Sequence, residues 1–340
     1  MATARKLPSG SWRARVYSHK ENGKKVYKSF TAPSKREAEL LAAQFKNGIK
    51  VSADNSKTII EAVKGYINAK EGVLSPSTVR GYDRMVKYYK PIEHYKLYQF
   101  SNEKAQIFIS DLSKTLSPKT VSNIFGLLTS SIGLYCPDMR LKVTLPTNIP
   151  SQKNAPSDED IQALFNTAPK TLKICIALSA FGSLRRGEVC ALKYGDIENN
   201  IVYVRADIVK DRNGEWIYKA PKTPDSIRKV VALPDEVIDL IGEGEEDEFI
   251  IKWTPDSVTK RFIDLKKSLN IDNIRYHDLR SYFASIGVAL GIPDIYLADY
   301  GGWTHNSKIL KSAYQKKIVS ISEAYSNRMK SHFSDLIKKV

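Results

Sequence analysis

The sequence is poor in cysteine and lacks any long hydrophobic run. Its 340 residues include only three cysteines, and their spacing fits neither a paired disulfide framework nor a set of metal ligands. No apolar run approaches the roughly 18 residues that a membrane-spanning helix needs. The N-terminus also lacks the apolar stretch of a secretory signal. These absences predict a protein of a reducing cytoplasm, with no membrane partner and no bound metal.

Acidic residues are scarce relative to basic ones. Lysine and arginine number 53 against 37 aspartates and glutamates, which gives a net charge of +16. The composition is otherwise that of a folded protein, with 42% hydrophobic and 26% charged residues, and this excludes a mainly disordered chain. A surplus of positive charge on a folded protein indicates a polyanionic partner, and nucleic acid is the first candidate.

Half of the charge surplus lies in residues 1–56, which hold 12 basic and 4 acidic side chains, or +8. The alternation in Ser11–Tyr17 and the hairpin signal Asn22-Gly23 predict two paired strands, and Ser34-x-x-Glu37 predicts the start of a helix. The sequence therefore predicts a small DNA-binding sheet backed by one helix. The side chains expected to contact DNA there are Arg13, Arg15, Tyr17, Lys25 and Lys28.

Two polar linkers, near residues 51–57 and 146–156, divide the rest of the chain. Between them, apolar residues at helical spacing and the start signals Ser75-Pro76 and Ser117-Pro118 predict a bundle of four helices. Lys119 is expected on the polar side of its last helix, facing DNA. The predicted domains are 1–56, 57–150 and 151–340.

The third domain is predicted to mix helices and short strands. Helices are expected near 157–168, 170–182 and 186–193, and strands at 201–204, 216–219 and 230–233. Asn213-Gly214 predicts a hairpin turn that joins the first two strands. The fold class is therefore multidomain and mainly α, with small β-sheets.

Short motifs in this third domain carry groups suited to phosphate chemistry. Two arginines, Arg185 and Arg186, precede an apolar-spaced helix, and Lys222 lies in a turn between predicted strands. His277 and Arg280 share one helix face because they are three residues apart. Each motif also has an ordinary explanation: a surface arginine pair, a solvated turn lysine and a helix cap.

A last group follows Gly301-Gly302, where Trp303, His305 and Tyr314 occur within a few residues. An Arg, a Lys, a His-x-x-Arg pair, a Trp and a Tyr, in that order within one basic domain, resemble the tyrosine recombinases of the phage-integrase family. The resemblance covers the whole chain: the N-terminal sheet resembles an arm-binding domain and the bundle resembles a core-binding domain. It differs from the family pattern Gly-Leu-Arg-x-x-Glu at Ser183, where glycine is usual.

The resemblance implies roles for the matched residues. Arg185 and Arg280 would clamp the nonbridging oxygens of a phosphodiester, His277 would act as general base or proton relay, and Lys222 would protonate the leaving 5′ oxygen. Tyr314 would attack phosphorus and form a 3′-phosphotyrosyl link. This chemistry conserves the energy of the broken bond, so the prediction includes no metal, ATP or other cofactor.

The remaining positions are supporting ones. Glu188 would support the arginines, and either Trp303 or His305 would fill the sixth catalytic position. We favour Trp303, because an indole N–H can donate to a phosphate oxygen.

The sequence thus predicts an integrase of a phage or other integrative element in the cytoplasm of a bacterial host. The resemblance implies double-stranded attachment-site DNA as substrate, a homotetramer on that DNA, and an accessory excision or DNA-bending protein. Two alternatives stay open: a nickase resembling type IB topoisomerases, and a non-catalytic DNA-binding regulator on the same fold. The apolar stripe of the C-terminal tail predicts packing on a neighbouring subunit or on its own domain.

Overall fold

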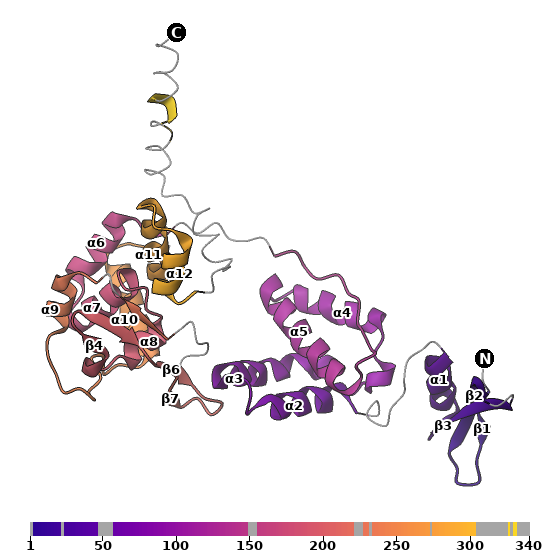
Figure 1. The fold of residues 1–340 in the computed structure, drawn as a ribbon. Coiled ribbons are helices and arrows are strands. Elements are labelled where there is room, and N and C mark those ends of the chain that lie inside the picture. Colours follow the sequence, from indigo (N-terminus) through magenta and orange to yellow (C-terminus); the bar gives the residue numbers. More distant parts are fainter. Residues whose placement is uncertain are drawn as a thin grey trace. The chain divides into compact units, whose positions relative to one another are not determined.

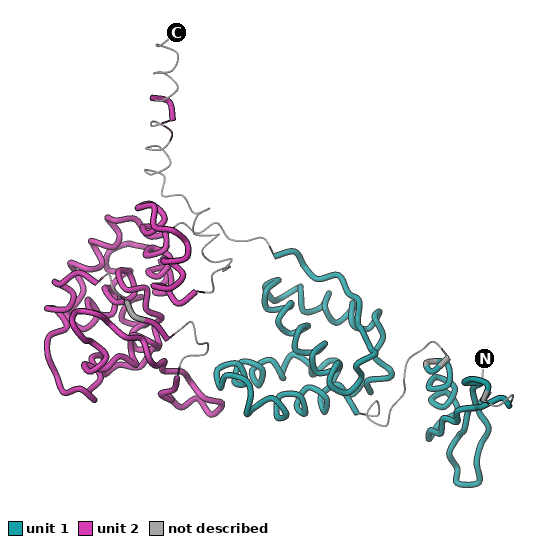
Figure 2. The backbone as a smooth tube through the Cα atoms, viewed as in Figure 1, with its two compact units in different colours: residues 1–150 teal, residues 151–340 magenta. Residues whose placement is uncertain are grey.

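A computed structural model of the chain describes residues 3–21, 24–46, 57–148, 155–220, 227–230, 233–272, 274–303, 326 and 329–331. The chain divides into two units, residues 1–150 and 151–340, shown in teal and magenta in Figure 2. The first unit holds two hydrophobic cores, one in the N-terminal sheet and one in the helices that follow. The division into three domains stays a prediction.

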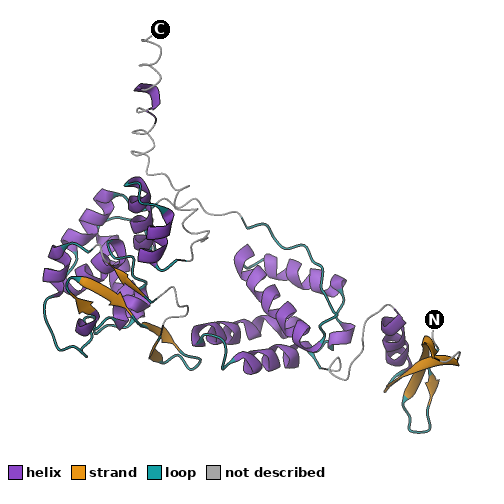
Figure 3. Ribbon diagram, viewed as in Figure 1, coloured by secondary structure: helices purple, strands orange, loops and turns teal. Residues whose placement is uncertain are grey.

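A three-stranded antiparallel sheet opens the chain (Figure 3). Its strands are β1 (Arg5–Lys6), β2 (Trp12–Glu21) and β3 (Lys24–Ala32), and helix α1 (Lys35–Lys46) follows them. The alternation of β2 buries Ala14 and Val16, which form a small core with alanines of α1. The predicted pattern of two strands and a helix is confirmed.

The second part of unit 1 is helical (Figure 1). It consists of α2 (Ile59–Lys70), α3 (Pro76–Met85), α4 (Asn102–Ser113), α5 (Pro118–Tyr135) and the 3-10 segments η2 (Val86–Ile92) and η3 (Leu97–Gln99). Ser117 Oγ accepts a hydrogen bond from the Thr120 amide and caps α5 as predicted. Ser75 occupies the corresponding position before α3, but its side chain makes no capping bond, so this detail of the prediction is wrong.

Unit 2 surrounds a larger core built on α7. Its helices are α6 (Asp158–Thr167), α7 (Lys170–Ala180), α8 (Arg186–Ala191), η4 (Tyr194–Asp196), α9 (Asp235–Ile241), α10 (Pro255–Ser268), α11 (Asp278–Ala289) and α12 (Asp294–Gly301). Helix α7 is central because nearly its whole length is buried, from Leu172 to Ala180. It packs against α6, α8, α9, α10 and α11.

Two small sheets complete unit 2. One has the order β4-β5-β8, with strands β4 (Ile197–Glu198), β5 (Ile201–Val204) and β8 (Arg228–Val230). The other is a hairpin of β6 (Asp207–Lys210) and β7 (Trp216–Lys219). The predicted partner of 216–219 is therefore wrong, because the turn at Asn213-Gly214 joins β7 to β6. The hairpin turn has a clear sequence signal, but β6 has too few alternating residues to be recognised as a strand beforehand.

In the part of the chain that the structure describes, no helix is both long and apolar enough to cross a membrane.

Candidate active site

Arg185 precedes helix α8 and is held by Glu188 one turn into that helix. The Arg185 amide donates to Glu188 Oε2 at 2.8 Å, and its Nη1 donates to Oε1 at 2.6 Å. Its other terminal nitrogen donates to the Gly302 carbonyl at 2.9 Å. The Arg185 side chain keeps 35% of its surface exposed, so it can meet a ligand from outside.

Arg280 reaches the same place from helix α11. Its two terminal nitrogens donate to the carbonyls of Ser183 and Gly301. The residue is almost completely buried, and its guanidinium lies 4.5 Å from the centre of the Trp303 ring, a cation–π distance. Two arginines that are 95 residues apart in sequence thus converge on the turn that follows α12.

His277 begins helix α11, one turn before Arg280. Partial burial lowers the pKa of His277, and the positive charge of Arg280 lowers it further. The imidazole is therefore mainly neutral near pH 7, the form that accepts a proton. It is also accessible to solvent, as a base that meets a bound substrate must be.

Trp303 closes this cluster. It is 6% exposed and packs with Leu297 and Ala298 of α12 and with Ala284 of α11. Gly302 ends α12 in the left-handed conformation, at φ 59°, and this turn directs the carbonyls of Gly301 and Gly302 at the two arginines. The backbone thus holds the arginines apart and in place.

Ser183 lies at the centre of the cluster in an unfavourable conformation. Its φ is 55°, in the left-handed region that favours glycine. Its carbonyl accepts hydrogen bonds from Arg280 and from a third arginine, Arg228. The geometry explains why glycine suits this position, and the serine here carries the corresponding strain.

Arg228 belongs to the site, although sequence reasoning gave it no role. It lies at the start of β8 and donates to both oxygens of Glu188, at 2.9 and 3.3 Å. The sequence held one signal for this role: Arg228 stands at the start of an apolar strand, and an arginine buried there needs a hydrogen-bond acceptor. The partner could not be inferred, because Glu188 is 40 residues away.

Glu188 is the buried carboxylate at which the arginines meet. Burial alone would raise its pKa, but the charges of Arg228, Arg185 and Arg280 outweigh that effect, and the pKa of Glu188 is lowered. Asp207, at the start of β6, has the opposite balance: burial and the charge of Glu188 raise the pKa of Asp207 to about 6. The two carboxyl groups differ because only Glu188 has bonded arginines.

Three residues of the predicted set lie outside the described residues: Lys222, His305 and Tyr314. The structure brings together Arg185, Glu188, His277, Arg280 and Trp303. By chain connectivity, Lys222 precedes Arg228 by six residues and Tyr314 follows Trp303 by eleven.

The predicted DNA contacts of the N-terminal sheet divide between its two faces. Arg13, Arg15 and Tyr17 lie on the face opposite α1, where Arg15 packs over the Tyr27 ring. Lys25 shares this face by its register with Tyr27, whereas Lys28 pairs with the inward Val16 and lies over the Phe45 ring of α1. The open face is basic and aromatic, as in β-sheets that bind nucleic acid.

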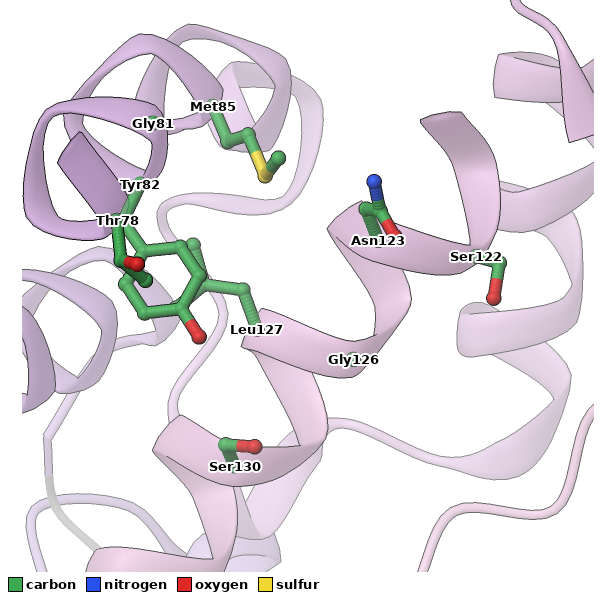
Figure 4. A pocket seen from close by; sticks show the side chains of 9 residues that line it. All are labelled: Thr78, Gly81, Tyr82, Met85, Ser122, Asn123, Gly126, Leu127 and Ser130. Atoms are coloured by element: carbon green, nitrogen blue, oxygen red, sulfur yellow. The ribbon is translucent and has the colours of Figure 1, made fainter. Parts of the chain in front are cut away.

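Lys119 is exposed in the first turn of α5. A pocket lies between α3 and α5 and does not include Lys119 in its lining (Figure 4). The pocket has a volume of about 430 Å³. Its lining is mostly small or polar and contains no charged side chain: Thr78, Gly81, Tyr82, Met85, Ser122, Asn123, Gly126, Leu127 and Ser130. This pocket therefore has none of the groups that the cluster in unit 2 provides. Among the described residues, no group of histidine, cysteine and acidic side chains could hold a metal ion.

No family model and no curated protein matches the sequence. Solved structures do match. An integrase of the Tn1549 transposon, in complex with a circular intermediate DNA, superposes with a TM-score of 0.64 over 81% of this chain and 100% of its own, at 15% identity. A lambda integrase tetramer bound to a Holliday junction gives a TM-score of 0.58 over 92% of this chain and 94% of its own, also at 15% identity. The chain has the fold of the tyrosine recombinases.

The tyrosine-recombinase fold confirms the resemblance that the motifs indicated, together with the predicted fold class. A lambda integrase dimer bound to a COC' core site likewise matches 92% of this chain, with a TM-score of 0.55 at 15% identity. At this identity the likeness establishes the fold alone. The activity has to be argued from the residues.

Proposed function

We propose that this protein is a site-specific DNA recombinase that cleaves and rejoins strands through a 3′-phosphotyrosyl intermediate, and that it integrates or excises a mobile element. The observation that carries the proposal is the convergence of Arg185 and Arg280 on one turn, with the neutral His277 beside them. This arrangement fits a phosphodiester, whose reaction concentrates charge on two nonbridging oxygens.

The two arginines have complementary positions for this task. Arg185 is partly exposed and Arg280 is buried beneath Trp303, so a bound phosphate would meet one guanidinium at the surface and one at depth. Each donor that acts on a charge developing in the transition state contributes about 3 kcal/mol, by analogy with oxyanion-hole donors. Both arginines are held by backbone carbonyls and by Glu188, so little reorganisation is needed before reaction.

Protons move at two places in the proposed reaction. Tyr314 must lose its phenolic proton as it attacks phosphorus, and His277 is the group that accepts it. The leaving 5′ oxygen takes a proton from Lys222, and the products are a phosphotyrosyl protein and a free 5′ hydroxyl. Reversal of these steps against a second 5′ hydroxyl joins the new strand.

The substrate and assembly in this proposal are those of the structural neighbours. Double-stranded attachment-site DNA would be bound by a homotetramer, as the lambda integrase complex with a Holliday junction is a tetramer. The basic open face of the N-terminal sheet would contact a second DNA site, and an accessory excision or bending protein would assist. The charge of +16 supports a polyanionic substrate.

The test is a covalent trapping experiment. The protein is incubated, with a chelator present, with nicked duplexes that carry the attachment site of its element, and an SDS-stable protein–DNA adduct is sought. The expected result is an adduct that Tyr314→Phe abolishes, while Tyr300→Phe, a tyrosine of α12, leaves it intact. An adduct that persists in Tyr314→Phe would refute the assignment of the nucleophile. Salt-sensitive binding without adduct on every element end would favour the non-catalytic DNA-binding alternative.

A further inference from the structure

We infer that Arg228 is a positioning residue for strand cleavage, which holds Glu188 and the turn after α12 so that both phosphate-clamping arginines keep their geometry. The inference rests on the proposed function, and it assigns a role to a residue outside the catalytic set of the resemblance.

To the described residues, Arg228 donates hydrogen bonds at three places: Glu188 of α8, Ser183 before it and Tyr300 of α12. Its terminal nitrogens form a fork on Glu188, and one of them also donates to the Ser183 carbonyl at 3.1 Å. Its Nε donates to the Tyr300 carbonyl at 3.0 Å. The planar guanidinium is suited to such divergent contacts, whereas a lysine ammonium presents its donors from a single point.

Each of these acceptors adjoins a contact of a catalytic arginine. Glu188 binds Arg185, the Ser183 carbonyl also accepts from Arg280, and Tyr300 directly precedes the glycines whose carbonyls bind both arginines. A displacement of Arg228 would therefore move the supports of Arg185 and Arg280 together.

Burial separates this role from direct catalysis. The Arg228 side chain is only 4% exposed, so it does not reach a DNA phosphate at the surface.

The experiment compares single-turnover adduct formation and DNA affinity in Arg228→Lys and Arg228→Gln. We expect the cleavage rate to fall about 100-fold in Arg228→Gln and about tenfold in Arg228→Lys, the size of effect that a misplacement of about 1 Å produces. The Kd for DNA should stay within about twofold, because the side chain is buried. The matched control is Arg205→Gln, an exposed arginine of the same unit that binds two carboxylates, and its rate should be unchanged.

The pH profile distinguishes positioning from a general loss of structure. Glu188 faces Arg185, Arg228, Arg280 and the carboxyl of Asp207. Removal of Arg228 raises the pKa of Glu188, so the rate of Arg228→Gln should fall more steeply than the wild-type rate as the pH drops below neutral. Adding Glu188→Gln should abolish that extra dependence, while the titration of His277 remains common to all variants.

Each outcome decides whether Arg228 positions the two phosphate-clamping arginines. Wild-type rates in both Arg228 variants overturn the inference, and so does a rate that falls only in proportion to the folded fraction, with an unchanged pH profile. If Arg228→Gln fails to fold, Arg228→Lys, which keeps the charge, carries the comparison. A wild-type protein that forms no adduct instead overturns the proposed function, and the inference with it.

Discussion

Replacing Ser183 by glycine should stabilise unit 2, because the wild-type serine carries two separate costs. Its left-handed backbone, at φ 55°, costs an L-residue about 1 kcal/mol. Its buried Oγ has no hydrogen-bond partner among the described residues, which costs a further 1 kcal/mol or so. The larger entropy of glycine in the unfolded chain opposes these gains by about 0.5–1 kcal/mol. The expected net gain is therefore about 1 kcal/mol.

The assay is thermal or denaturant unfolding of the full chain, with the transition of unit 2 followed separately. A gain of about 1 kcal/mol raises Tm by roughly 2–4 °C in a unit of this size. Ser183→Ala removes the hydroxyl and keeps the strain, so the two variants separate the two costs. Asn270→Gly is the control, because Asn270 is exposed at φ 55° and asparagine tolerates that region. A destabilised Ser183→Gly would refute the reasoning.

Three further predictions concern residues near Ser183 and the proposed base His277. A Cβ added at Gly187 would lie 1.9 Å from Asp207 Oδ1, so Gly187→Ala should destabilise the protein by about 1–3 kcal/mol. The control is Gly133→Ala, which has open space around the added Cβ and should not lower stability. Urea unfolding measures both effects. Burial raises the pKa of Asp207 to about 6, above its unfolded value of about 4, so its ionisation opposes folding fully above pH 6. Asp207→Asn should therefore be more stable than the wild type at neutral and alkaline pH, and the difference in stability should shrink as the pH falls from 6 to about 4. In the proposed mechanism the neutral form of His277 reacts, so the cleavage rate should rise with pH through a midpoint below the usual range of histidine. His277→Gln should remove that step in a pH–rate profile.

Local elements and most described members of the candidate site were predictable from the sequence, while their spatial partners were not. Alternation and capping signals predicted the N-terminal strands and most helix starts, because these depend on neighbouring residues. Arg185 and the His277–Arg280 pair could be chosen because they occur in a fixed order along the chain. Arg228 was missed because its importance depends on Glu188, Ser183 and the α12 turn, which are far away in sequence.

The strand β6 shows the same limit in the fold. Its four residues carry too little pattern to identify a strand, and its pairing with β7 depends on the hairpin turn. The hairpin signal at Asn213-Gly214 was correct, but only the three-dimensional structure identified β6 as the strand that precedes the turn and pairs with β7.

The cluster at Glu188 has a consequence for stability as well as for chemistry. Arg185, Arg228 and Arg280 surround the Glu188 carboxylate, and even with the nearby Asp207 carboxyl ionised the positive charges outnumber the negative ones. Mutual repulsion of these cations lowers the stability of the DNA-free folded state, and a bound phosphodiester would reduce that repulsion. By linkage, a ligand that binds only the folded form stabilises that form. Under the proposed function, attachment-site DNA would therefore stabilise the folded state of unit 2, because its phosphates balance the positive charge of these arginines.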